Sequence, residues 1–144
     1  MPALDRIHGA IRTALINDGW TITHDPYVIK YSGVTLFADL GAERAIAIER
    51  GDQKIVVEIK SFTGASPVQE LKLLLGQYDL YRGFLELTAP DRTLYLALSD
   101  TIYETIFLQP AIQMIVQRYQ LPLLIVNVET EEVVSWPQSP NIAP

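Results

Sequence analysis

The chain has 144 residues, of which 49% are hydrophobic, and it carries a formal net charge of −6. This length fits one domain with a single core, and the apolar content excludes a chain that is largely disordered. The absence of cysteine excludes disulfides, thiolate metal sites and cysteine nucleophiles, and two histidines are too few for a histidine-rich zinc site.

The first predicted element is an amphipathic helix over residues 4–18, in which apolar side chains recur at helical spacing. Gly19 is well placed to cap its C-terminal end. A short strand over residues 20–24 and an extended segment over residues 27–33 follow, and an Asp-Pro turn separates them.

Three strands are expected next, over residues 35–40, 44–50 and 54–62. The Gly-Asp-Gln sequence at 51–53 is typical of a tight connection, because glycine and aspartate adopt turn backbones at little cost. The second and third of these strands should therefore form a hairpin.

A long helix follows, with Ser66 as its expected N-cap and Pro67 at its first position. Glu70 lies near the position at which a capping box carries an acid. The side chains predicted to form the buried stripe of this helix are Val68, Leu71, Leu75, Tyr78 and Leu85.

The remaining sequence alternates strands and helices. A strand that is apolar on both sides, as a central strand should be, precedes a helix with Asp100 as its expected cap. A second helix follows Pro110, and two further strands complete the pattern. The predicted ranges are 92–99, 100–107, 110–120, 121–129 and 131–136.

This order of elements predicts an α/β protein in which helices cover both faces of a mixed sheet, as a three-layer α/β/α sandwich. We expect one domain over residues 1–136 and a flexible, proline-rich tail over residues 137–144. The apolar runs are too short to span a bilayer, and the first residues lack the apolar core of a signal peptide. A cytoplasmic protein with no membrane contact is therefore expected.

The negative charge argues against strong non-specific DNA binding by the isolated chain. Most of the lysines and arginines lie in residues 1–72, however. Any DNA should therefore contact the N-terminal half of the chain.

Three polar side chains on the predicted central strands suggest a site for phosphodiester hydrolysis. Asp39 lies near the end of one strand, and Glu58 and Lys60 lie two apart on another, so these two point to the same face. Two carboxylates and the carbonyl of Ile59 would suit a hard divalent cation, which lowers the pKa of a bound water. Lys60 would orient that water or help to deprotonate it, or it would stabilise the developing charge.

A Glu and a Lys two apart on a strand are more often a solvated surface pair that contributes little. The functional interpretation is favoured because this strand otherwise reads as central, and because aspartate is normally depleted in an apolar strand such as that of Asp39. Gln77 and Tyr81 lie four residues apart on one helical face, from which they would support a phosphate or a water. The alternative for this pair is a partly buried tyrosine beside a solvated glutamine.

Asp5, His8 and Arg12 lie on one strip of the first predicted helix, beside its apolar stripe. His8 would contact a phosphate, carry a proton or act as a minor ligand, or it is simply a residue at the boundary of the core. The roles of His8 and Asp5 stay open at this point. Trp20 and Trp136 are interpreted as packing residues rather than as platforms for stacked bases.

Three segments taken together, "LDRIHGAIRTALINDGWTITHDPY", "ADLGAERAIAIERGDQKIVVEIKSF" and "LGQYDLYRGFL", resemble the XisH family of cyanobacterial fdxN element excision controlling factors. The resemblance covers residues 4–136. That family is similar to the restriction-endonuclease-like PD-(D/E)xK superfamily. The resemblance thus implies a three-layer sandwich with Asp39, Glu58 and Lys60 at the catalytic positions.

Gln77 and Tyr81 match the QxxxY motif of RecB-like nucleases, whereas Ala38 stands where the superfamily often has a proline before its aspartate. The resemblance implies a metal-dependent DNA endonuclease that uses Mg²⁺ or Mn²⁺. It also implies a role in programmed DNA excision, together with a site-specific recombinase and a small partner protein of the XisI type.

Two other functions stay open, and with them the question of whether the chain is an enzyme. In the first, the chain is a non-catalytic interaction subunit that uses the same fold to bind an XisI-like partner or a recombinase. Its net charge and the apolar strands near the C-terminus motivate this alternative. In the second, the chain is one component of a toxin–antitoxin-like pair. A homodimer is a further expectation, since double-strand cleavage often needs two sites.

Overall fold

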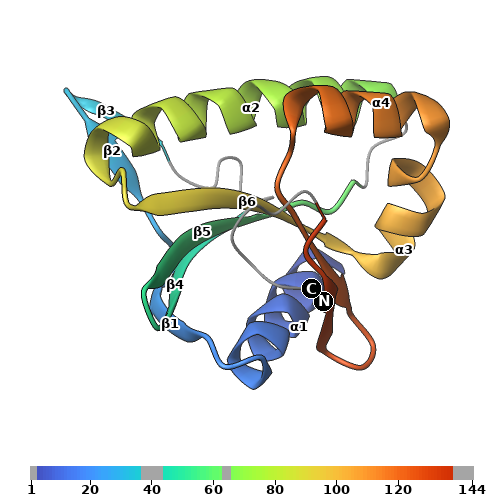
Figure 1. Ribbon diagram of the computed structural model, residues 1–144, viewed down its shortest axis with the longest axis horizontal. Coiled ribbons are helices and arrows are strands. Elements are labelled where there is room, and N and C mark those ends of the chain that lie inside the picture. The colour runs from blue at the N-terminus through green and yellow to red at the C-terminus, as the bar shows by residue number, and fades with distance from the viewer. Residues whose placement is uncertain (1–2, 37–43, 63–65, 138–144) are drawn as a thin grey trace.

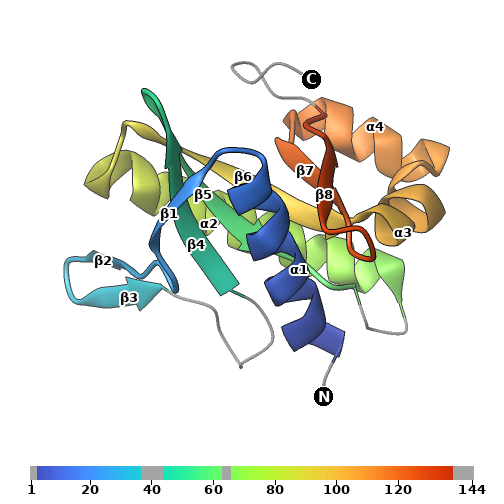
Figure 2. The same ribbon diagram turned by 90° about the horizontal axis from the view of Figure 1, so that it is seen from below.

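A mixed β-sheet lies between two layers of helices in the computed structural model (Figure 1). Helices α2 (Pro67–Thr88) and α4 (Pro110–Tyr119) cover one face of the sheet. Helix α1 (Ala3–Asn17) covers the other face, and it lies in front of the sheet when the molecule is seen from below (Figure 2). The predicted three-layer α/β/α sandwich is therefore confirmed.

The structure describes residues 3–36, 44–62 and 66–137. In these ranges the main sheet has six strands in the order β1-β4-β5-β6-β7-β8, and β2 and β3 form a separate two-stranded sheet. The strands are β1 (Thr21–His24), β2 (Ile29–Tyr31), β3 (Val34–Leu36), β4 (Arg44–Arg50), β5 (Gln53–Ile59), β6 (Arg92–Ser99), β7 (Leu123–Asn127) and β8 (Glu132–Ser135).

Strands β5, β6 and β7 run parallel to one another, whereas the pairs β1–β4, β4–β5 and β7–β8 are antiparallel. The connection from β4 to β5 is the predicted hairpin, and Gly51 in its turn has a φ of +61°. The three parallel strands end at one edge of the sheet, at Ile59, Ser99 and Asn127. This carboxyl edge is where ligands commonly bind in open α/β sheets.

Two apolar layers flank the sheet, and β6 contributes to both because successive residues of a strand point to opposite faces. Leu94, Leu96 and Leu98 pack in the layer under α2. Tyr95 and Ala97 pack in the layer under α1. All five side chains are buried, so β6 is the central strand that its apolar sequence predicts.

Helix α1 ends at Asn17, and Gly19 follows with a φ of +94°, which confirms it as the C-terminal cap. The amide of Trp20 donates to the carbonyl of Leu15 over 3.0 Å, as in a left-handed helix end. Trp20 is buried and its ring centroid lies 5.7 Å from that of buried Trp136. Both tryptophans thus pack in the core, as expected.

Ser66 caps α2 as predicted, because its Oγ accepts a hydrogen bond from the amide of Gln69 over 3.3 Å, and Pro67 is the first helical residue. Replacing Ser66 with alanine leaves that amide without its acceptor. We expect Ser66→Ala to lower the free energy of unfolding by about 1 kcal/mol in chemical denaturation. Ser66→Asp, which keeps an acceptor at the cap, should retain the stability; an equal loss in both variants would contradict this role.

The buried stripe of α2 differs from the prediction. Val68 is exposed and Leu75 is only partly buried, whereas Leu74 and Tyr81 lie in the core. The buried side chains of this helix are Leu71, Leu74, Tyr78, Tyr81 and Leu85. Three consecutive leucines at positions 73–75 place apolar side chains on several faces of α2, so the sequence alone does not mark the face that meets the sheet.

The predicted strand over residues 54–62 extends too far, because β5 ends at Ile59. The amide of Lys60 still donates to the carbonyl of Ala97 on β6, over 2.9 Å. Phe62 has a φ of +46°, which is incompatible with a continuing strand. The strand therefore stops at the position that separates Glu58 from Lys60.

The cap after β6 also differs from the prediction, since Ser99 rather than Asp100 occupies it. The Oγ of Ser99 accepts a hydrogen bond from the amide of Ile102 over 3.1 Å. The helix begins as α3 (Asp100–Ile102) and continues as a π-helical turn, η2 (Tyr103–Phe107). Serine and aspartate are about equally suitable as caps, so the sequence did not distinguish them.

The extended segment over residues 27–33 contains β2, which pairs with β3 in a tight hairpin. Ser32 and Gly33 both have a positive φ, 51° and 81°, as a two-residue hairpin turn requires. Ile29 is buried in the layer under α2. Beyond Leu36, the predicted strand over residues 35–40 lies outside the described residues.

Residues 138–144 of the predicted tail also lie outside the described residues. Pro137, the last residue described, accepts a hydrogen bond at its carbonyl from the amide of Leu123 over 3.1 Å. Within the described ranges, none of the helices combines the length and the apolar character needed to cross a membrane.

Candidate functional site

Glu58 and Lys60 are almost fully buried, with exposed fractions of 2% and 3%. They are the only charged side chains buried to this extent in the part of the chain that the structure describes. The Nζ atom of Lys60 lies 3.0 Å from Oε2 of Glu58, which is the distance of a direct ion pair. A solvated surface pair, the alternative interpretation of these residues, is therefore wrong.

The strand register explains why both side chains are enclosed. Glu58 lies between Ala45 on β4 and Leu96 on β6, in the middle of the sheet. It follows Val56 by two residues, so both point towards the face covered by α2. Lys60 lies just beyond the end of β5 and turns back to the same carboxylate.

Helix α2 completes this contact from above the sheet. Lys60 Nζ donates a hydrogen bond to Oε1 of Gln77, which is one of the predicted site residues. Tyr81 lies one turn further along α2 and is buried, with an exposed fraction of 7%. The structure thus brings Glu58, Lys60 and Gln77 together, and it places Tyr81 on the adjoining part of the buried face.

The predicted metal ligands are only partly placed. Asp39 lies outside the described residues. Ile59, the proposed carbonyl ligand, is the last residue of β5 and is paired with Arg44 and Ala97. In the described ranges, no group of three or more acidic, histidine or cysteine residues would hold a metal by itself. Glu58 alone does not make a site for a hard cation, and Asp39, the second carboxylate expected from the sequence, lies outside the residues that the structure describes.

A second polar cluster joins α1 to the end of β1, on the opposite face of the sheet. The Nε2 atom of His8 lies 3.4 Å from Oδ1 of Asp25, and Arg12 forms an ion pair with Oδ2 of the same carboxylate. Asp25 was not among the predicted site residues. The signal in the sequence was that His8 and Arg12 outnumber the one acid, Asp5, on their strip of α1. A further carboxylate near them was therefore to be expected. Asp5 belongs to α1, but the position of its side chain is not described.

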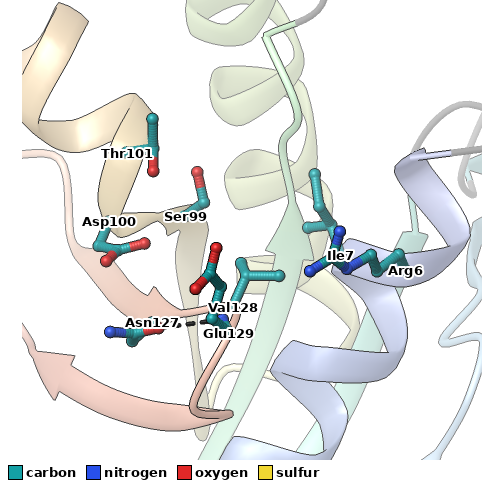
Figure 3. Close-up of a pocket in the computed structure, with 8 residues that line it drawn as sticks. All are labelled: Arg6, Ile7, Ser99, Asp100, Thr101, Asn127, Val128 and Glu129. Atoms are coloured by element: carbon teal, nitrogen blue, oxygen red, sulfur yellow. Dashed lines mark hydrogen bonds between the residues drawn. The ribbon is translucent and has the colours of Figure 1, made fainter.

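A third polar region is a cavity of about 460 Å³ at the carboxyl edge of the sheet (Figure 3). Arg6 and Ile7 of α1 form one wall. Asp100 at the start of α3 and Glu129 after β7 lie on the other side, and the Oδ1 atom of Asn127 accepts a hydrogen bond from the amide of Glu129. One basic and two acidic side chains give this cavity mixed charge, which favours neither DNA nor a cation.

One titratable group on α2 has a clearly shifted pKa. Burial raises the pKa of the Tyr78 phenol, and the neighbouring Arg82 partly offsets this rise. The guanidinium of Arg82 lies 5.6 Å from the centre of the Tyr78 ring. The phenol therefore stays protonated at neutral pH and cannot act as a base there.

Comparison with known proteins identifies relatives over almost the whole chain. The model of the family described as XisH protein matches residues 1–134. A crystal structure of an XisH family protein from Nostoc punctiforme PCC 73102 is 38% identical, covers 92% of this chain and 99% of its own, and has a TM-score of 0.83. Among curated proteins, none matches the chain significantly.

A second solved structure gives the same result. The crystal structure of a fdxN element excision controlling factor protein from Anabaena variabilis is 41% identical and also has a TM-score of 0.83. The match covers 92% of this chain and 98% of that one. Family model, sequence identity and fold agree, and the chain belongs to the XisH family.

Proposed function

We propose that this protein acts in the excision of a DNA element and that Glu58 and Lys60 belong to a metal-dependent site for phosphodiester hydrolysis. The observation that carries the proposal is the buried ion pair at the carboxyl end of β5. The relative from Anabaena variabilis is described as a fdxN element excision controlling factor, which supports a role in this process. DNA, an XisI-like protein and a site-specific recombinase are the proposed partners.

Energetics favour a functional origin for this pair. Moving two charges from water into a protein interior costs several kcal/mol per ion, and an apolar pair of the same volume is often at least as stable. Glu58 lies in a strand whose other buried side chains are aliphatic, and Lys60 follows the end of that strand, so packing alone does not account for them. Perturbed or buried charges of this kind are common at catalytic sites.

Each residue has a role in the proposed reaction. Glu58 and Asp39 would hold Mg²⁺ or Mn²⁺ with the carbonyl of Ile59, and the bound ion would supply a water of lowered pKa. Lys60 is held between Glu58 and Gln77 and would donate to the attacked phosphate.

Tyr81 is proposed as a supporting residue for this arrangement. It lies one turn from Gln77 on the same side of α2 and is almost fully buried. A tyrosine hydroxyl both donates and accepts hydrogen bonds, so it would fix the orientation of polar neighbours around the phosphate.

The test combines metal binding with DNA cleavage. We expect Glu58→Gln, which keeps the shape of the side chain, to weaken Mn²⁺ binding and any Mn²⁺-dependent cleavage by more than about 100-fold, since loss of outer-shell groups alone commonly costs 10–100-fold. Calorimetric titration and cleavage of plasmid DNA, each with and without the XisI-like protein, measure the two effects. Glu104→Gln, which alters an exposed carboxylate on η2, is the matched control.

An unchanged cleavage rate in a folded Glu58→Gln protein would overturn the proposed hydrolysis. The interaction subunit is the second candidate, and it is favoured by the ion pair with Lys60, through which the chain itself supplies the counter-charge of Glu58. A stable one-to-one complex with the XisI-like protein, combined with no Mn²⁺ binding in either state, would support this candidate instead.

A further inference from the structure

The outer face of α2, which points away from the sheet, carries a row of exposed leucines. Leu73, Leu80 and Leu87 have exposed fractions of 66%, 56% and 61%. They lie seven residues apart, so they fall on one line along the helix. Isolated exposed leucines are common, but a row at heptad spacing is typical of a helix that packs against another helix.

Two glycines alternate with these leucines. Gly76 follows Leu73 by three residues, and Gly83 follows Leu80 by three. A Cβ atom added at either glycine would meet nothing within 4 Å, so each marks an open recess on the surface of α2. Glycine weakens a helix interior by roughly 1 kcal/mol relative to alanine, and packing inside this protein does not require it at these positions.

We propose that this face of α2 binds α2 of a second copy of the chain in an antiparallel pair. The two-fold axis would cross the outer face of α2 at the level of residue 78 along the helix. In this register, Leu80 of each copy lies over Gly76 of the other. In the same register, Leu73 lies over Gly83, because each of these leucines precedes a glycine by three residues, whereas Leu87 lies beside the longer side chain of Gln69. Two of the three leucines of one helix thus fit recesses of an identical helix.

The charges beside the row match the same register. Lys72, Asp79 and Glu86 are exposed and follow one flank of the leucine row, again seven residues apart. In the antiparallel pair, Lys72 of each copy meets Glu86 of the other, and the pairing occurs twice. Asp79 meets its own copy near the axis, where Arg82, 3.7 Å away in the same chain, offsets the repulsion.

A parallel pair of the same helices has no such match. There, the flank with Lys72 and Glu86 would face the opposite flank, which carries Gln77 and Phe84. Flanking charges set the orientation of paired helices, so the antiparallel arrangement is favoured. Because Gln77 lies at the edge of α2 that contacts Lys60, the row of leucines remains free of the candidate site.

The first experiment measures the mass of the protein in solution. We expect the wild type to be a dimer by sedimentation equilibrium at about 100 μM, because association rises with protomer concentration. Leu80→Glu, which buries two charges at the centre of the interface, should weaken dimerisation more than about 100-fold. Val134→Glu on β8 is the matched control, since Val134 is 57% exposed, and it should leave the dimer intact.

The second experiment tests the register. Lys72→Glu should weaken the dimer about tenfold, Glu86→Lys should do the same, and the double variant should recover it because the pairs are reversed rather than removed. Failure of the double variant to recover would overturn the antiparallel register. A monomeric wild type would overturn the dimer, and loss of XisI-like protein binding in Leu80→Glu would then assign this face to that partner. None of these outcomes depends on whether Glu58 binds a metal.

Discussion

Replacing Lys60 with methionine is expected to lower the free energy of unfolding by about 3–5 kcal/mol, because it leaves the buried Glu58 carboxylate without its counter-charge. Methionine has nearly the length of lysine, so the loss measures charge rather than volume. Urea denaturation followed by tryptophan fluorescence provides the measurement, with both tryptophans buried in the folded protein.

Two controls identify the cause of this loss. The double variant Glu58→Gln, Lys60→Met removes both charges and should recover most of the stability, since replacing a whole buried ion pair is often neutral. Lys54→Met removes a lysine that is 42% exposed and lies 3.5 Å from Asp91, and it should change the stability by less than about 1 kcal/mol. Equal losses in the Lys60 and Lys54 variants would show that the ion pair contributes little.

Phe107→Ala is expected to cost about 3–5 kcal/mol, the range for removing a buried aromatic side chain. Phe107 is fully buried at the end of η2, and its ring lies 5.2 Å from that of Phe62 in an edge-to-face contact. This contact ties the segment after β5 to the segment after β6. Removing the ring therefore opens a cavity between two parts of the chain that are distant in sequence.

The neighbouring residue provides the control. Leu108 belongs to the same turn, and its amide donates to the carbonyl of Tyr103 over 3.0 Å, but its side chain is 49% exposed. Leu108→Ala should change the free energy of unfolding by no more than about 0.5 kcal/mol, as is usual for surface positions. Similar midpoints for the two variants in thermal unfolding would contradict the central role assigned to Phe107.

The sequence predicted the fold well where local signals and tertiary packing agree. The bounds of β4 and β6 match the prediction, because charged or turn residues mark their ends. Ser66 was identified as a cap because proline follows it. The errors fall where the signals are degenerate, as at the equivalent caps Ser99 and Asp100, or where apolar residues surround a helix on all sides.

The candidate site was predictable in part. A charged pair two apart in an apolar strand predicted the common face of Glu58 and Lys60, and helical spacing predicted that Gln77 and Tyr81 lie on one side of α2. The contact of Lys60 with Gln77 needed the structure, because it depends on how α2 crosses the sheet. Asp25 was missed for the same reason. Its partners His8 and Arg12 lie on α1, and the sequence does not show how α1 is placed against the end of β1.

The position of α1 has a consequence for biosynthesis. This first helix packs against β7 and β8, the last two strands described, and Trp20 meets Trp136 beside it. During translation, α1 is made long before the part of its packing surface that β7 and β8 form. The hairpin of β4 and β5 can pair with β6 and α2 earlier, because these neighbours follow one another along the chain. The part of α1 that packs against β7 and β8 therefore stays uncovered until these strands have been translated, whereas the apolar side chains that β4, β5 and β6 contribute to the same layer are made earlier.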